Sequence, residues 1–304
     1  MNEMNVQLLS RSPGERLWFF WRDNVIYSRT ERGERPLVGA AGGPFGVAQG
    51  PEGEALLLSR EHVCRSRDGM AWEKRRLPRP WGLSSLMLWG GGGPAVIGSE
   101  EEGEAARLMV YPAGGRPLCV AEGLWPGAEA LRLEPEPGHI WLGFPLADGT
   151  WASRELLTPA GGEGDWMLGS LRVWGRTRLT VGDMAAAATP EALHWVTITQ
   201  GRGLAQVVYR QWDGAGLHKP QVLSECRRAE ACVVTAAGNG PRVFWQEGGR
   251  GVMAQSTGGR WVRRLWCNPA ERLARVRLAG REWENRATWG LVDTARWELV
   301  WPEE

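Results

Sequence analysis

GEALLLSREHVCRSRDGMAWEKRRL, from Gly53 to Leu77, is the stretch of sequence that decides the fold. It holds a short apolar run at Ala55 to Leu58, a polar break, a second short run at Val63 to Ser66, an Asp-Gly turn and then Trp72. This order predicts three short strands joined by tight turns. Three such strands cannot bury an apolar face alone, so they need neighbours of the same kind.

The same unit recurs along the whole chain. A large apolar residue stands inside the second expected strand of each copy, at intervals of roughly 39 to 54 residues. The seven positions are Trp18, Leu57, Val96, Trp141, Trp195, Trp245 and Trp289. A four-stranded propeller blade repeats every ~40 to 50 residues. The pattern, with no convincing helix, predicts an all-β fold: a seven-bladed β-propeller of four-stranded antiparallel blades.

The whole chain, residues 1–304, is expected to form this single domain, with blades at approximately 1–39, 40–79, 80–122, 123–170, 171–225, 226–268 and 269–304. The segment from Leu168 to Gly182 looks irregular and is expected to be an elaboration between the fourth and fifth blades. The last unit ends after its third strand, at Trp301. Either the last blade has three strands, which we favour, or the strand at Asn5 to Ser10 serves as its outer strand. Closure into a ring removes exposed sheet edges.

The composition indicates a folded protein with many turns. The chain is 43% hydrophobic and 23% charged and contains 42 glycines, which fits a globular fold with repeated tight turns. A formal charge of +1 provides no field for nucleic acid or an anionic membrane, so neither is expected as a partner. No segment has the length of a membrane helix, and Met1 to Arg16 lack the order of a secretory signal. Five scattered cysteines favour reduced thiols, and a cytoplasmic location is expected.

One turn has a recognisable motif. Residues Ser66 to Trp72 read S-x-D-G-x-x-W, in which Asp68 and Ser66 can bond the turn backbone, Gly69 supplies positive φ, and Trp72 packs between sheets. The motif resembles the Asp-box of BNR-repeat, sialidase-like propellers. In that family the box is structural, so the resemblance implies a fold and not an activity. The family's F/Y-R-I-P motif is not recognisable, and the three tyrosines share one repeat position, which is typical of packing residues. Sialidase activity is therefore not expected.

No cofactor or metal site is expected. The histidines His62, His139, His194 and His218 fall in different units, and no H-x-H, H-E-x-x-H or C-x-x-C spacing occurs. The four glycines from Gly90 to Gly93 form a turn without a following helix or lysine, so they do not make a phosphate-binding loop.

Eight of the 19 tryptophans share two repeat positions, which predicts that these eight form the core between blades. Among those outside the two positions, Trp81, Trp125, Trp174 and Trp266 lie in or near the expected connections between blades. In a propeller, the turns between second and third strands share one face with the connections between blades, and we call this the loop face. Ligand sites usually lie there. The candidate ligand-binding residues on it are Glu61, His62, Trp81, Trp125, Asp148, Arg202 and Arg250.

These observations favour a non-catalytic binding or scaffold module that recognises a protein or a saccharide on its loop face. The alternative is a carbohydrate-active enzyme, a glycosidase or lyase, that uses acidic residues of the same face. It predicts two carboxylates about 5 to 10 Å apart and one carboxyl group with a raised pKa. A structural member of a larger assembly is a third option and predicts an exposed apolar patch. The sequence leans towards binding and leaves enzymatic activity open.

Overall fold

The computed structural model describes residues 6–12, 15–39, 45–50, 52–59, 61–76, 86–90, 93–102, 105–112, 116–124, 130–136, 139–157, 166–178, 180–213, 215–237, 240–267, 273–280, 288–293 and 295–301. All regular elements in these residues are β-strands, which confirms the predicted all-β class. None of the described residues forms a helix with the length and apolarity needed to cross a membrane.

The described strands form six sheets, one of which joins the last three strands of the chain to the first four. We divide that sheet in two and describe seven successive antiparallel units. We number them 1 to 7. Units 1 to 3 contain β1 (Val6–Ser12), β2 (Glu15–Arg22), β3 (Val25–Thr30) and β4 (Gly33–Gly39); β5 (Gly46–Gln49), β6 (Ala55–Leu58), β7 (His62–Ser66) and β8 (Glu73–Arg76); and β9 (Leu86–Gly90), β10 (Gly93–Glu102), β11 (Ala105–Pro112) and β12 (Leu118–Leu124). Units 4 and 5 contain β13 (Leu131–Glu136), β14 (His139–Pro145), β15 (Thr150–Leu157) and β16 (Met167–Arg176); and β17 (Thr180–Ala188), β18 (Ala192–Gly201), β19 (Leu204–Asp213), β20 (Gly216–Leu217) and β21 (Gln221–Cys226). Units 6 and 7 contain β22 (Ala229–Ala237), β23 (Gly240–Glu247), β24 (Arg250–Thr257) and β25 (Arg260–Cys267); and β26 (Leu273–Ala279), β27 (Trp289–Asp293) and β28 (Glu298–Trp301).

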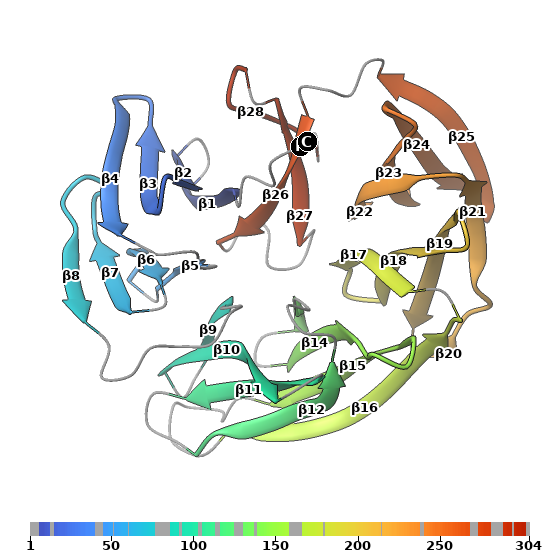
Figure 1. The fold of residues 1–304 in the computed structure, drawn as a ribbon, viewed down its shortest axis with the longest axis horizontal. Coiled ribbons are helices and arrows are strands. Elements are labelled where there is room, and N and C mark those ends of the chain that lie inside the picture. Colours follow the sequence, from blue (N-terminus) through green and yellow to red (C-terminus); the bar gives the residue numbers. More distant parts are fainter. Residues whose placement is uncertain are drawn as a thin grey trace.

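The units are arranged around a common centre in chain order (Figure 1). The first strand of a unit lies towards the centre, and the later strands lie progressively further out (Figure 1). First strands of successive units touch: β1 contacts β5, β5 contacts β9, β13 contacts β17, and β17 contacts β22. This arrangement places the apolar faces of neighbouring units against each other, which is how short sheets that cannot stand alone become buried.

The first and last units are joined directly. β26 pairs with β1 in parallel, with Gln7 opposite Arg277 and Leu9 opposite Ala279. Gly280 follows this pairing with a φ of +100°, and a Cβ atom there would lie 2.0 Å from the backbone oxygen of Ser10. Only glycine, which has no Cβ atom, allows the two backbone segments to come this close. β1 is therefore the innermost strand of unit 1 and contacts β26, and in the described residues unit 7 has three strands of its own.

The repeat marker predicted from the sequence lies in the second strand of every unit: β2, β6, β10, β14, β18, β23 and β27. Trp18, Trp141, Trp195 and Trp245 are buried there, as expected for residues between neighbouring sheets. Trp174 was singled out as lying outside these positions, yet it is also buried, stacks on Trp151 and donates its indole N–H to Ser153 Oγ at 2.7 Å.

The expected elaboration at Leu168 to Gly182 is wrong. Most of this segment is β16, the outer strand of unit 4, and its last residues begin β17. The alternation of exposed and buried side chains is weak in β16, and its pairing with β15 contains two register shifts. An outer strand with such irregularities buries little of either face, so its hydrophobic period is lost from the sequence.

The Ser66–Trp72 turn has the local geometry expected from its residues. One carboxylate oxygen of Asp68 accepts backbone N–H bonds from Met70 and Ala71, both at 2.8 Å, and Ser66 Oγ donates to the same oxygen at 3.1 Å. Bonds from Ala71 and Met70 lower the pKa of Asp68. Trp72 meets Phe19 of unit 1 edge-on at 5.7 Å. The turn therefore has a structural role that fastens unit 2 to unit 1.

Candidate functional site

Two of the predicted site residues, Trp81 and Trp125, lie outside the described residues. The other five lie in turns between second and third strands of four units. Glu61 and His62 lie at the start of β7, Asp148 lies between β14 and β15, Arg202 lies between β18 and β19, and Arg250 begins β24. They share the loop face by topology. However, no hydrogen bond or ion pair among the described residues joins any two of these five side chains.

Several of these side chains are held within their own hairpins or by neighbouring strands. Asp148 accepts the backbone N–H of Thr150 at 2.8 Å and pairs with Arg176 at 3.1 Å. The backbone bond of Thr150 is the main cause of the lowered pKa of Asp148. The backbone N–H of His62 donates to Ser59 Oγ at 3.1 Å, and burial, with help from Lys74, lowers the pKa of its ring. Such contacts are those of solvated hairpin turns.

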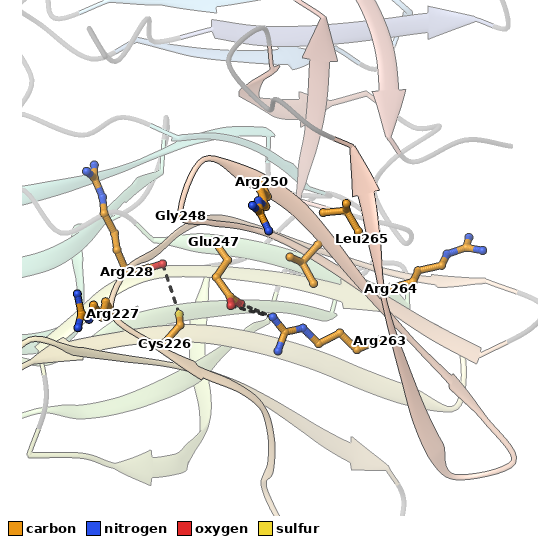
Figure 2. Close-up of a pocket in the computed structure, with 10 residues that line it drawn as sticks. Cys226, Arg227, Arg228, Glu247, Gly248, Arg250, Arg263, Arg264 and Leu265 are labelled. Atoms are coloured by element: carbon orange, nitrogen blue, oxygen red, sulfur yellow. Dashed lines mark hydrogen bonds and ion pairs between the residues drawn. The ribbon is translucent and has the colours of Figure 1, made fainter.

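Arg250 lies in a different setting, because it lines a groove of about 660 Å³ between units 5 and 6. Three separate segments form the groove: the end of β21 with its connection to β22, the turn between β23 and β24, and the middle of β25. The lining residues are Cys226, Arg227, Arg228, Glu247, Gly248, Arg250, Val252, Arg263, Arg264 and Leu265. Figure 2 shows Arg227 and Arg228 on one side, Arg250 above Glu247, and Arg263 on the other side. We call this the basic groove.

Strand pairing explains why these side chains gather. Trp245 lies opposite Val252 on β24, and Val252 lies opposite Leu265 on β25, so the three form one row across the sheet. Trp245 and Val252 belong to the core shared with unit 5. Leu265 continues the row outwards and is 56% exposed. The floor of the groove is therefore the outer margin of the core between two units.

Glu247 is the single carboxylate in the lining, and it is fully engaged. Arg263 Nη2 donates to both of its oxygens at 2.8 Å, Ser224 Oγ donates at 2.9 Å, and the buried indole N–H of Trp245 donates at 3.0 Å. Partial burial raises the pKa of Glu247, but the bonds from Trp245, Ser224 and Arg263 outweigh burial, so the net pKa is lowered. Glu247 is thus an ionised anchor that holds Arg263 in place.

The arginines outnumber this carboxylate. Arg228 pairs with Glu230 at 2.8 Å, whereas Arg227 and Arg250 have no carboxylate partner in the described part of the chain. Arg264 turns away from the groove and its guanidinium lies 4.0 Å from Met253 Sδ (Figure 2). The groove therefore presents two unpaired guanidinium groups, beside a third that Glu247 fixes.

The two acidic groups among the lining residues, the Cys226 thiol and the Glu247 carboxylate, are each engaged in hydrogen bonds. The Cys226 thiol donates to the backbone oxygen of Arg228 at 3.4 Å. Burial, followed by the nearby Glu247 carboxylate, raises the pKa of Cys226, so the thiol stays protonated at neutral pH. The described residues contain no cluster of three His, Cys, Asp or Glu side chains that could hold a metal ion. The positions of the groove arginines and their excess positive charge both suit the binding of an anion.

Sequence reasoning found only part of this site. It selected Arg250 as a candidate on the loop face, but it did not select Arg227, Arg263 or Leu265. The available signal was the alternation in β25, Arg260 to Cys267, which places Arg263 and Leu265 on one side and Arg264 on the other.

No protein-family model and no curated protein sequence matches this chain. Three solved structures illustrate the fold likeness. BBS1N, in complex with ARL6DN, is 13% identical, with a TM-score of 0.53 over 96% of this chain and 88% of that chain. A fungal lectin from Aleuria aurantia, a six-bladed β-propeller, is 15% identical, with a TM-score of 0.47 over 87% and 95%. A catalytically inactive virginiamycin B lyase from Staphylococcus aureus is 14% identical, with a TM-score of 0.49 over 87% and 86%. The first likeness shows a shared overall fold and nothing about function; the other two, below 0.5, carry no argument.

Proposed function

We propose that the chain is a single seven-bladed β-propeller, with one blade for each of the seven units. The radial order of the units, the contacts between successive first strands and the parallel pairing of β1 with β26 all support it. Units 1 to 6 supply blades of four main strands, and unit 7 supplies a blade of three. A rigid ring of this kind offers loops and interblade grooves as binding surfaces.

The propeller acts as a non-catalytic binding or scaffold module, and its ligand site is the basic groove on the loop face. The observation that carries this proposal is the charge imbalance: Arg227 and Arg250 line the groove with no carboxylate partner among the described residues, next to an Arg263 that Glu247 holds in place. Guanidinium groups form strong, directional bonds with carboxylate, sulfate and phosphate groups. The ligand is therefore anionic.

A hydrolytic or eliminative enzyme at this groove is the weaker alternative. A glycosidase needs two carboxylates, one of which has a raised pKa. The groove holds Glu247 alone, its pKa is lowered, and it is bonded to Arg263. The other carboxyl groups with a shifted pKa, Asp68, Asp148 and Asp213, are also lowered.

Citrate and pyrophosphate, titrated by calorimetry at low ionic strength, are expected to bind the protein and to lose affinity as salt is added. The double variant Arg227→Ala, Arg250→Ala is expected to bind them about tenfold more weakly, because each partly exposed ion pair contributes up to about 1 kcal/mol.

Arg260→Ala is the matched control, since Arg260 is an exposed arginine on the same strand as Arg263 but outside the groove. It should leave both affinities unchanged. Absence of binding by both anions, or equal losses in the control and in the double variant, would remove the basic groove as the ligand site.

A further inference from the structure

We infer that the occupant of the basic groove is an extended acidic segment of a partner protein, in which an apolar side chain stands between acidic ones. This inference rests on the proposed anion-binding function of the groove. It is carried by three features of the lining taken together: the unpaired arginines, the exposed apolar floor and the fixed negative charge of Glu247.

The apolar floor calls for a ligand with an apolar side chain. Leu265 is 56% exposed although it continues the row of the buried Trp245 and Val252. Covering such a side chain is favourable by about 25 cal/mol for each Å² removed from water. A simple inorganic anion or a sulfated sugar has no aliphatic side chain with which to cover Leu265. A leucine, isoleucine or valine of a peptide does.

The charges set where the acidic groups of that peptide lie. Arg227 is on one side of the groove and Arg250 is on the upper rim, whereas Glu247 occupies the middle (Figure 2). The Glu247 carboxylate repels a second carboxylate placed beside it, although Arg263 neutralises part of that charge. A peptide with an apolar residue in the middle and an Asp or Glu on each side matches this arrangement of charges across the groove.

The strands beside the groove favour an extended segment. β25 is the terminal strand of its sheet, and β21 pairs only with β19 in the described residues. Terminal strands offer unpaired backbone groups to an added chain. Nucleic acid fits less well, because single strands bind through stacking on exposed aromatic rings and the lining has none.

The test uses fluorescein-labelled nine-residue peptides with alternating Glu and Leu, measured by fluorescence anisotropy with the full-length protein. The first control peptide has Gln in place of Glu, and the second has Ser in place of Leu. A chondroitin sulfate oligosaccharide of equal charge represents the saccharide class. The Glu/Leu peptide is expected to bind at least about tenfold more tightly than the Gln peptide and about fivefold more tightly than the Ser peptide and the oligosaccharide.

Two leucine variants distinguish the contribution of the groove floor to peptide binding from that of exposed apolar side chains elsewhere. Leu265→Ser is expected to lower the affinity for the Glu/Leu peptide about fivefold and to leave the affinity for citrate unchanged. Leu217→Ser is the matched control, since Leu217 is 46% exposed on β20 and lies outside the groove. It should change neither affinity. Both leucines are exposed, so thermal unfolding should match the parent protein.

The outcomes distinguish this inference from the function on which it rests. If citrate and the oligosaccharide bind through Arg227 and Arg250 but the Glu/Leu peptide has no advantage, or if Leu265→Ser has no effect, the peptide inference is overturned and the anion site remains. If none of the anions binds through these arginines, both are overturned.

Discussion

Replacing Trp195 with alanine is expected to lower the free energy of unfolding by about 4 kcal/mol, within the range for deleting a large buried aromatic side chain. Trp195 is fully buried and packs between units 4 and 5, with its ring 5.1 Å from that of Trp174 and 6.2 Å from that of Trp151. Alanine would leave a cavity where two neighbouring sheets meet. The measurement is the midpoint and slope of guanidinium unfolding.

The backbone of unit 4 is shaped to admit this ring. A Cβ atom at Gly143 would lie 2.2 Å from two ring carbons of Trp195, so only glycine leaves the required space. Trp195→Phe is the control and should cost much less than alanine, because it keeps most of the ring and removes an indole N–H that has no hydrogen-bond partner in the described structure. A loss below about 1 kcal/mol for Trp195→Ala would mean that this interface contributes little to stability.

The second large effect is a loss of stability in acid caused by His194. This histidine is buried in β18, and its Nδ1 lies 2.7 Å from the hydroxyl of Tyr209. Burial lowers the pKa of His194 to about 4. The folded protein therefore holds the ring neutral at pH values where the unfolded chain, with an ordinary pKa of about 6.5, has already bound a proton.

The direction in which stability changes with pH follows from this difference in the pKa of His194 between the folded and unfolded states. A lowered pKa in the folded state gives stability that is complete above about pH 6.5 and is lost as the pH falls towards 4. A difference of about 2.5 pH units corresponds to roughly 3 kcal/mol by pH 4. The measurement is the unfolding free energy from pH 7 to pH 4 for the parent protein and for His194→Gln. Glutamine does not titrate, so its curve should be flatter by about that amount, and parallel curves would show that His194 is not the titrating group.

The repeat was readable in the sequence because it depends on residues that pack locally. Trp18, Trp141, Trp195 and Trp245 mark second strands, which are buried on both faces by neighbouring units, so each position demands a large apolar side chain. The Asp68 turn was equally readable, since the hydrogen bonds of the Asp68 carboxylate are made within a few residues. β16 was not, because an exposed outer strand places few demands on its side chains.

The basic groove was hidden for a different reason. Its walls come from the end of unit 5 and from three strands of unit 6, and the side chains meet only after the sheets are placed against each other. Arg263 and Leu265 carry no local mark that distinguishes them from other exposed residues of an outer strand. What sets them apart is Glu247, which lies on a neighbouring hairpin and fixes Arg263. The sequence therefore predicts the loop face more easily than the position of the basic groove on that face.

The parallel pairing of β26 with β1 has a consequence for biosynthesis. β1 is translated long before β26, its partner in the last unit, because the five intervening units and the rest of unit 1 lie between them in the chain. Until β26 is made, the inner margin of unit 1 is an unpaired strand edge, the kind of surface that invites association between nascent chains. The junction between units 1 and 7 can therefore form only after β26 has been translated, however early the individual sheets form.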